Sequence, residues 1–228
     1  MRHFPILLPM LLLAACGGSR QPTTLNDRPT LGVAEAAMTG GSPEIAVNVT
    51  RSILTREPYN IPAQMMLGRA LYALRLYPEG AAAYNVVLKL QPENAAAHLG
   101  LGRIKLADHD PKAAEEQFRR AAQLELRPET LNNLGIALDL QHRPTEAQAE
   151  YRRALQLDPG SAATRLNLAL SLLASGNASA ARAALPPDSP ENGRLAPEIA
   201  AAQRAIEGRS GNVPIPPATR PGMPHAPD

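Results

Sequence analysis

The sequence predicts an all-α protein, an α-solenoid of about five helical hairpins with a C-terminal capping helix and a disordered, Pro-rich tail. Three observations support this prediction. A motif of Leu, Gly and Ala positions recurs three times at a period of 33–34 residues. Aromatic residues make up only 3% of the 228 residues and Trp is absent, so the core must be built mostly from Leu and Ala. Pro stands between the predicted hairpins, where it ends a helix without breaking one.

The clearest repeat begins at residue 131 and ends at residue 159. It reads Leu131-x₂-Leu134-Gly135-x₂-Leu138, followed by Ala147-x₃-Tyr151, Ala154 and Pro159. This pattern resembles the tetratricopeptide repeat, with Leu in place of the first aromatic residue. Earlier copies centre on Gly102 and Gly68, with 33 and 34 residues between successive glycines. The missing residue falls in the connection near Pro128.

Degenerate copies flank these three repeats, and we assign residues 30–208 to the array and its cap. The first copy has its internal turn at Gly40-Gly41, and the last has a helix over 162–174 and a turn over 175–177. Terminal repeats are often atypical because they have a neighbour on one side only. One helical face predicts the capping helix, which Gly208 ends, and its residues are Leu195, Ile199, Ala202 and Ile206. We expect residues 209–228 to be disordered.

Local signals predict the packing within the hairpins. We expect Gly68, Gly102 and Gly135 to mark close helix crossings, where a larger side chain would overpack the core. Ser42 and Asp110 each precede a Pro, which predicts an N-cap residue followed by Pro at the first helical position.

The N-terminus has the pattern of a lipoprotein signal peptide, which we assign to residues 1–15. Arg2 and His3 form a positive region, an apolar stretch follows, and Leu-Ala-Ala precedes Cys16, the single Cys of the chain. We therefore expect Cys16 to carry a covalent diacylglycerol and an N-acyl lipid, with residues 16–29 as a flexible tether. The alternative is an ordinary signal peptide with an incidental Cys. Gly17, in place of Asp, favours the periplasmic face of the outer membrane.

Several function classes are disfavoured. A net charge of +2 gives no basic footprint for nucleic acid, and no apolar run is long enough to span a bilayer. The sequence has no phosphate loop and no nucleophile motif, so we predict no enzyme activity, no small-molecule substrate and no cofactor beyond the lipid. Asp108-His109-Asp110 is interpreted as a solvated turn, like His142 one repeat later, and His98 as a packing residue, so no metal site is predicted. The pairs Glu115-Glu116 and Arg119-Arg120 predict a solvated face with salt bridges.

The first helix of each hairpin is predicted to line a concave, protein-binding groove. We expect some of its apolar members to pack in the core instead. The mixture favours an apolar or amphipathic segment with a few polar anchors, bound as a helix, and the Lys/Asn clamp for terminal carboxylates is absent. The predicted groove residues are Met65, Arg69, Tyr72, Leu99, Arg103, Leu106, Asn132, Ile136, Asp139, Leu166 and Leu170.

The stretches 131–140, 146–155 and 167–176 resemble those of the TadD lipoproteins of tight-adherence (Flp) pilus systems, as does the lipoprotein start. This resemblance covers roughly residues 58–185. It implies a pilotin-like adaptor that is held at the membrane by its lipid and assists the outer-membrane secretin or another pilus or secretion assembly subunit. The alternative is a scaffold lipoprotein of another envelope process, such as outer-membrane protein assembly or cell-wall enzyme recruitment.

Overall fold

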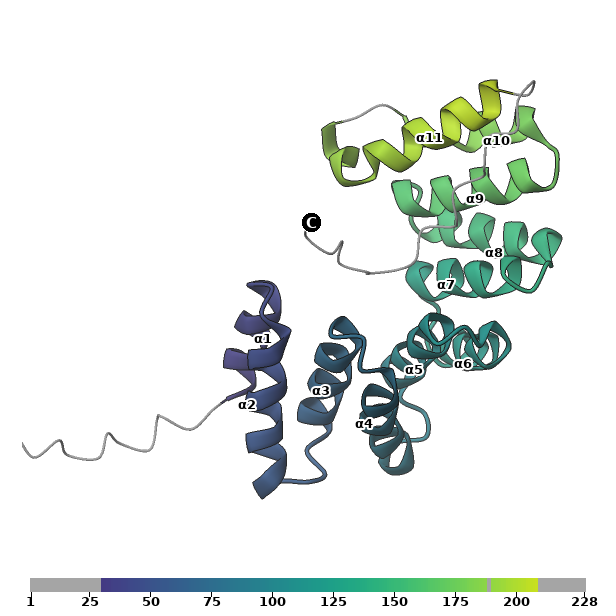
Figure 1. The fold of residues 1–228 in the computed structure, drawn as a ribbon. Helices are drawn as coiled ribbons and strands as arrows, with labels where there is room; N and C mark the ends of the chain where they lie inside the picture. Colours follow the sequence, from purple (N-terminus) through teal and green to yellow (C-terminus); the bar gives the residue numbers. More distant parts are fainter. Residues whose placement is uncertain (1–29, 188–189, 209–228) are drawn as a thin grey trace, which may run out of the picture.

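The computed structural model describes residues 30–187 and 190–208, all of whose regular elements are helical. Five antiparallel hairpins follow one another along an arc, and a 3₁₀ turn and a last helix close it (Figure 1). The all-α solenoid prediction is therefore confirmed. The signal peptide, Cys16, the tether and the Pro-rich tail lie outside the described residues. The helices are α1 (Leu31–Thr39), α2 (Pro43–Arg56), α3 (Ile61–Ala73), α4 (Tyr77–Leu90), α5 (Ala95–Ala107), α6 (Pro111–Leu124), α7 (Pro128–Asp139), α8 (Pro144–Leu157), α9 (Ala162–Ala174), α10 (Ala178–Ala184), η1 (Pro190–Leu195) and α11 (Ala196–Glu207).

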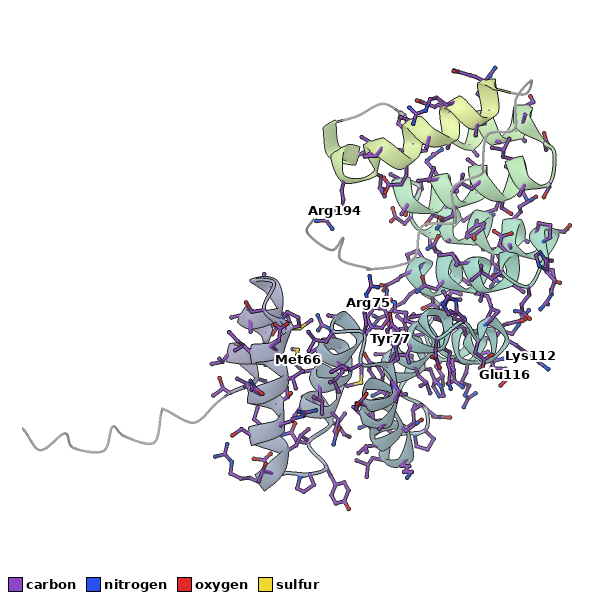
Figure 2. The ribbon with its side chains drawn as sticks, viewed as in Figure 1. Met66, Arg75, Tyr77, Lys112, Glu116 and Arg194 are labelled. Atoms are coloured by element: carbon purple, nitrogen blue, oxygen red, sulfur yellow. The ribbon has the colours of Figure 1, made fainter. Side chains whose placement is uncertain are left out.

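The hairpins form two layers. The first helices of successive hairpins (α1, α3, α5, α7 and α9) pack backbone against backbone. Among the described residues, the backbones of α2, α4, α6, α8 and α10 lie farther apart, although a salt bridge from Arg119 of α6 to Glu146 of α8 spans one of these gaps. The first set therefore forms the tighter, inner layer and the second set fans out on the outside. Figure 2 shows Lys112 and Glu116 of α6 on this outer side, away from the open side of the arc.

An aromatic ring in each of three outer helices packs against a glycine of its own hairpin. Tyr84, Phe118 and Tyr151 are almost fully buried, and a Cβ added at Gly68, Gly102 or Gly135 would lie 2.5–2.8 Å from the corresponding ring. Such separations are too short for a real Cβ contact. The predicted close crossings are therefore confirmed, and each glycine is required by the ring that faces it.

The turn inside every hairpin uses the same backbone conformation. Gly41, Arg75, His109, His142 and Gly176 all have φ between +59° and +81°. In the His109 turn the Asp110 N–H donates to the Lys105 carbonyl, which is the six-to-one hydrogen bond of a Schellman helix end. The prediction that His109 and His142 are turn residues is confirmed. These two histidines and Arg75 adopt a conformation that suits glycine better.

At three connections between hairpins, a side chain of the following inner helix is hydrogen-bonded to a backbone carbonyl of the connection. Gln64, His98 and Arg165, which occupy the same repeat position, lie 2.9–3.2 Å from the carbonyl oxygen of the Pro six residues earlier. His98 is half-buried and also contacts Gln117. It therefore holds a connection in place within the fold, which refines its interpretation as a packing residue.

The connection between α6 and α7 is one residue shorter than the others. It lacks the Pro and ends in Arg127, whose side chain makes no capping hydrogen bond, whereas Asn94 and Ser161 cap α5 and α9. Leu131 then occupies the carbonyl-binding position and is buried. At this shorter connection, the hydrogen bond to a carbonyl is therefore replaced by the burial of an apolar side chain.

Ser42 and Asp110 both occupy the predicted N-cap position before a Pro, but only Asp110 makes a capping hydrogen bond. The Asp110 carboxylate accepts a hydrogen bond from the Ala113 N–H at 3.0 Å. Ser42 occupies the N-cap position of α2, but its side chain makes no capping hydrogen bond. The two residues have similar backbone angles, so the longer Asp side chain reaches the amide and the shorter Ser side chain does not.

The C-terminal helix covers the end of the stack. Ile199, Ala202 and Ile206 of α11 are buried and Leu195 is half-buried. Ile199 and Ala202 share a cluster with Leu166 and Leu170 of α9. The face expected for the capping helix is the face that packs.

Candidate protein-binding face

The inner layer carries every residue that was predicted to line the groove, since all eleven lie on α3, α5, α7 or α9. Burial separates them into three groups: core, internal polar contacts and accessible residues. Five apolar members belong to the core, because their side chains are at most 7% exposed. They are Leu99, Leu106, Ile136, Leu166 and Leu170. These side chains hold neighbouring hairpins together and are not displayed to a partner.

Two polar members are used inside the fold. The two carboxylate oxygens of Asp139 accept hydrogen bonds from Ser171 at 2.8 Å and from Tyr151 at 2.9 Å. Burial raises the pKa of Asp139, and these hydrogen bonds oppose that rise. Asn132 accepts from the Asn167 amide at 3.0 Å. Asp139 and Asn132 therefore join α7 to α8 and α9, and they are poor candidates for partner anchors.

The remaining four predicted residues form an accessible group at the first half of the arc. Arg69 is exposed, and Met65, Tyr72 and Arg103 are half-buried. Tyr72 packs near Tyr77 of α4, with ring centroids 6.0 Å apart and planes tilted by 44°. We define Met65, Arg69, Tyr72 and Arg103 as the basic inner face. It lies on α3 and α5, so its members come from two adjacent hairpins.

Arg103 is the most constrained member of the basic inner face. Its guanidinium pairs with the Glu129 carboxylate at the first turn of α7. Burial lowers the pKa of Arg103, the nearby Tyr72 and Tyr84 hydroxyls raise it, and the Arg69 charge lowers it further. The Arg103 Nε–H is buried and has no hydrogen-bond partner. The cation is thus partly desolvated and incompletely paired.

Neither Tyr77 nor Glu129 was predicted, although each touches the basic inner face. Tyr77 begins an outer helix, and Glu129 lies in the first turn of an inner helix. All eleven predicted residues lie at or beyond the fifth position of an inner helix, so the set includes no first-turn residue and no residue of an outer helix. The i to i+26 separation of Glu129 and Arg103 could have indicated the pair only once the helix bounds were known.

The charged group on α6 matches its prediction as a solvated face with salt bridges, except at Glu115. Glu115 is buried and accepts hydrogen bonds from Arg119, Gln141 and Arg143 at 2.6–2.9 Å. Burial raises the pKa of Glu115, but these three donors outweigh burial and leave the pKa below its usual value. Glu116 is exposed, as predicted. The prediction was wrong for Glu115 because only the neighbouring hairpin supplies Gln141 and Arg143.

The described residues offer neither a cluster of metal ligands nor a membrane-spanning helix. Within 30–187 and 190–208, no group of three or more potential metal ligands is present. None of the helices in this part of the chain is long and apolar enough to cross a membrane.

Comparison with known proteins places the repeats in a family. Residues 65–129 and residues 140–206 each match a tetratricopeptide repeat family. No curated protein sequence matches the chain.

Solved structures share the fold at low identity. MamA from Desulfovibrio magneticus RS-1 is 18% identical with a TM-score of 0.63, over 82% of this chain and 100% of that one. PilF of Pseudomonas aeruginosa is 17% identical with a TM-score of 0.63, over 78% of this chain and 84% of that one. A thermophilic tetratricopeptide protein of Thermus thermophilus is 23% identical with a TM-score of 0.57, over 61% of this chain and 78% of that one. At these identities the likeness extends to the fold alone.

Proposed function

Because the chain is a tetratricopeptide repeat protein, and so a protein-interaction scaffold, we propose that it is a lipid-anchored adaptor of tight-adherence pilus assembly. In this role it assists the outer-membrane secretin in the manner of a pilotin. The lipid on Cys16 holds it at the periplasmic face of the outer membrane, and the inner layer of helices binds the secretin or another assembly subunit.

The observation that carries the binding role is the basic inner face. Arg69, Tyr72 and Arg103 remain accessible on adjacent inner helices. The apolar residues Leu99 and Leu106, on the same helix as Arg103, are buried in the core. A surface that keeps charged and aromatic side chains at successive repeat positions is suited to recognition, since Arg and Tyr are enriched in binding hot spots. Repeat arrays of this kind are typically not enzymes.

The pilus assignment is supported by the sequence. The lipoprotein start and the stretches 131–140, 146–155 and 167–176 resemble TadD lipoproteins. PilF contributes a shared fold to this proposal and no more.

Deletion of the gene in its own bacterium tests the proposal. We expect detergent-resistant secretin multimers and surface pili to decrease, and the wild-type gene to restore both. Cys16→Ser should fail to restore them because the protein no longer follows the lipoprotein route. Normal multimers and normal piliation in the deletion strain would refute the pilus role.

The adaptor surface is tested in the same strain. Complementation with Arg69→Glu should be impaired, whereas complementation with Arg152→Glu should match the wild type, because Arg152 is an exposed residue of the outer helix α8. Equal restoration by both variants would contradict binding through the inner layer.

A further inference from the structure

We propose that the basic inner face binds the carboxylate side chains of an acidic segment in the partner protein. This inference rests on the proposed function, because it names the chemistry of the partner that the adaptor holds. The site is the surface between α3 and α5, centred on Arg69 and Arg103.

The charge balance of the surface favours an anion. Arg69 and Arg103 stand 34 residues apart, so they occupy the same position on successive inner helices, and α3 contacts α5. Their mutual repulsion is felt at Arg103, whose pKa the Arg69 charge lowers. Among the described residues, Glu129 is the only carboxylate that forms an ion pair with either cation. The two guanidinium groups therefore carry one uncompensated positive charge.

The pairing of Arg103 with Glu129 leaves binding capacity unused. Glu129 engages one terminal nitrogen through a single carboxylate oxygen, and the Nε–H is buried, so a ligand would bind at the terminal nitrogens. A guanidinium can hold a carboxylate through two parallel hydrogen bonds, and such charge-assisted bonds are among the stronger ones in proteins. Glu129 is half-exposed on the first turn of α7. Exposed ion pairs contribute little to stability, so a ligand carboxylate can compete with Glu129 for Arg103. We interpret Glu129 as an internal substitute for the carboxylate of the ligand.

The accessible side chains select an acidic segment over an apolar one. Leu99 and Leu106, which would have favoured an apolar helix, are buried. In Figure 2, Arg75 at the α3–α4 turn and Arg194 at the end of η1 project toward the open side of the arc. Both are exposed and add positive charge there. The Tyr72–Tyr77 pair offers an apolar surface beside the cations for a residue that flanks the acid.

Peptide binding to the full-length protein in detergent micelles tests the inference. The probe is a fluorescein-labelled peptide with alternating Asp and apolar residues and an amidated C-terminus, followed by fluorescence anisotropy. Its counterpart has every Asp replaced by Asn, and a third peptide is the Asn version with a free terminal carboxylate. We expect the Asp peptide to bind at least about tenfold more tightly than the other two, and less tightly as salt is raised.

Four variants locate the binding. Arg69→Glu and Arg103→Glu should each weaken binding of the Asp peptide by about tenfold or more. Glu129→Gln should strengthen it several-fold, because Arg103 is then released, and a folding defect cannot imitate a gain in affinity. Arg152→Glu on the outer layer is the matched control and should leave binding unchanged, with circular dichroism to verify that all variants are folded.

The inference is overturned if the Asp and Asn peptides bind equally, if Arg69→Glu has no effect, or if Glu129→Gln weakens binding. Preference for the free terminal carboxylate would also overturn it, in favour of a chain-end site. Should the peptide results fail while the deletion strain loses its secretin multimers, only the acidic chemistry is refuted. Should the Asp peptide bind while multimers form normally, the proposed function is refuted and the acidic site stands.

Discussion

Replacement of Gly135 by Ala tests the packing on which the array depends. An Ala Cβ would lie 2.5 Å from Cε1 of Tyr151, a ring that is fully buried and whose hydroxyl donates to Asp139 at 2.9 Å. The ring cannot retreat without weakening that hydrogen bond. Gly135→Ala should therefore destabilise the protein, although Ala is the better helix former.

The magnitude combines three effects. Ala in place of Gly inside a helix gains about 1 kcal/mol. Overpacking of a filled core costs about 1–3 kcal/mol. Displacement of the Tyr151 hydroxyl from Asp139 loses a hydrogen bond worth about 1 kcal/mol net. The expected outcome is a net loss of about 1–3 kcal/mol in the free energy of unfolding.

Urea denaturation followed by circular dichroism measures this loss. Gly32→Ala is the matched control, because its Cβ would meet nothing nearer than the Thr30 hydroxyl at 3.7 Å. That variant should be as stable as the wild type or more stable. Adding Tyr151→Leu to Gly135→Ala should cost less than Tyr151→Leu costs alone, since the smaller side chain accepts the new methyl group. A Gly135→Ala protein that is more stable than the wild type would refute the crossing argument.

Two further predictions concern the turns and the buried carboxylate. His109→Gly should raise the free energy of unfolding by up to about 1 kcal/mol, because His109 has φ of +61°. Gly176→Ala should lower the free energy of unfolding by about the same amount. Thermal melts of both variants check this, and a less stable His109→Gly would contradict it. Glu115→Gln should lower stability at neutral pH by about 1–3 kcal/mol, since the donors from Arg119 and Arg143 lose their charged acceptor. Because the folded-state pKa of Glu115 is depressed, its contribution is fully present above the unfolded-state pKa and is lost as pH falls through the folded-state pKa. Urea titrations at neutral and acidic pH should therefore show a flatter acid dependence for the variant, and parallel curves would refute this reasoning.

The sequence predicts features that arise within one hairpin. The helix over 162–174, the turns at Gly40-Gly41 and His109, and the crossings at the three repeat glycines all agree with the structure. These features depend on helix punctuation and on contacts between neighbours in the chain, which a fixed period makes visible. Even the shorter connection near Pro128 is apparent as one missing residue.

The sequence did not predict features that depend on contacts between two hairpins. The sequence placed Glu115 on an exposed charged face, but in the structure Gln141 and Arg143 of the next hairpin donate hydrogen bonds to it. The sequence placed Asp139 in the binding groove, but in the structure its two carboxylate oxygens accept hydrogen bonds from Ser171 and Tyr151. Side chains at helical spacing on one face can point either into an interface or into open space, and only the angle between hairpins decides which.

The sequence by itself determined that this chain is a stack of helical hairpins, because the spacing of Gly, Ala and Leu within one period admits few other packings. Only the tertiary structure decided which inner-layer residues remain for a partner. Leu166 and Leu170 are buried under the capping helix, while Arg69 and Arg103 stay accessible and short of carboxylates at the other half of the arc. The physical reason is that burial is a property of the neighbouring hairpin, and the repeat period alone does not say how closely that neighbour packs.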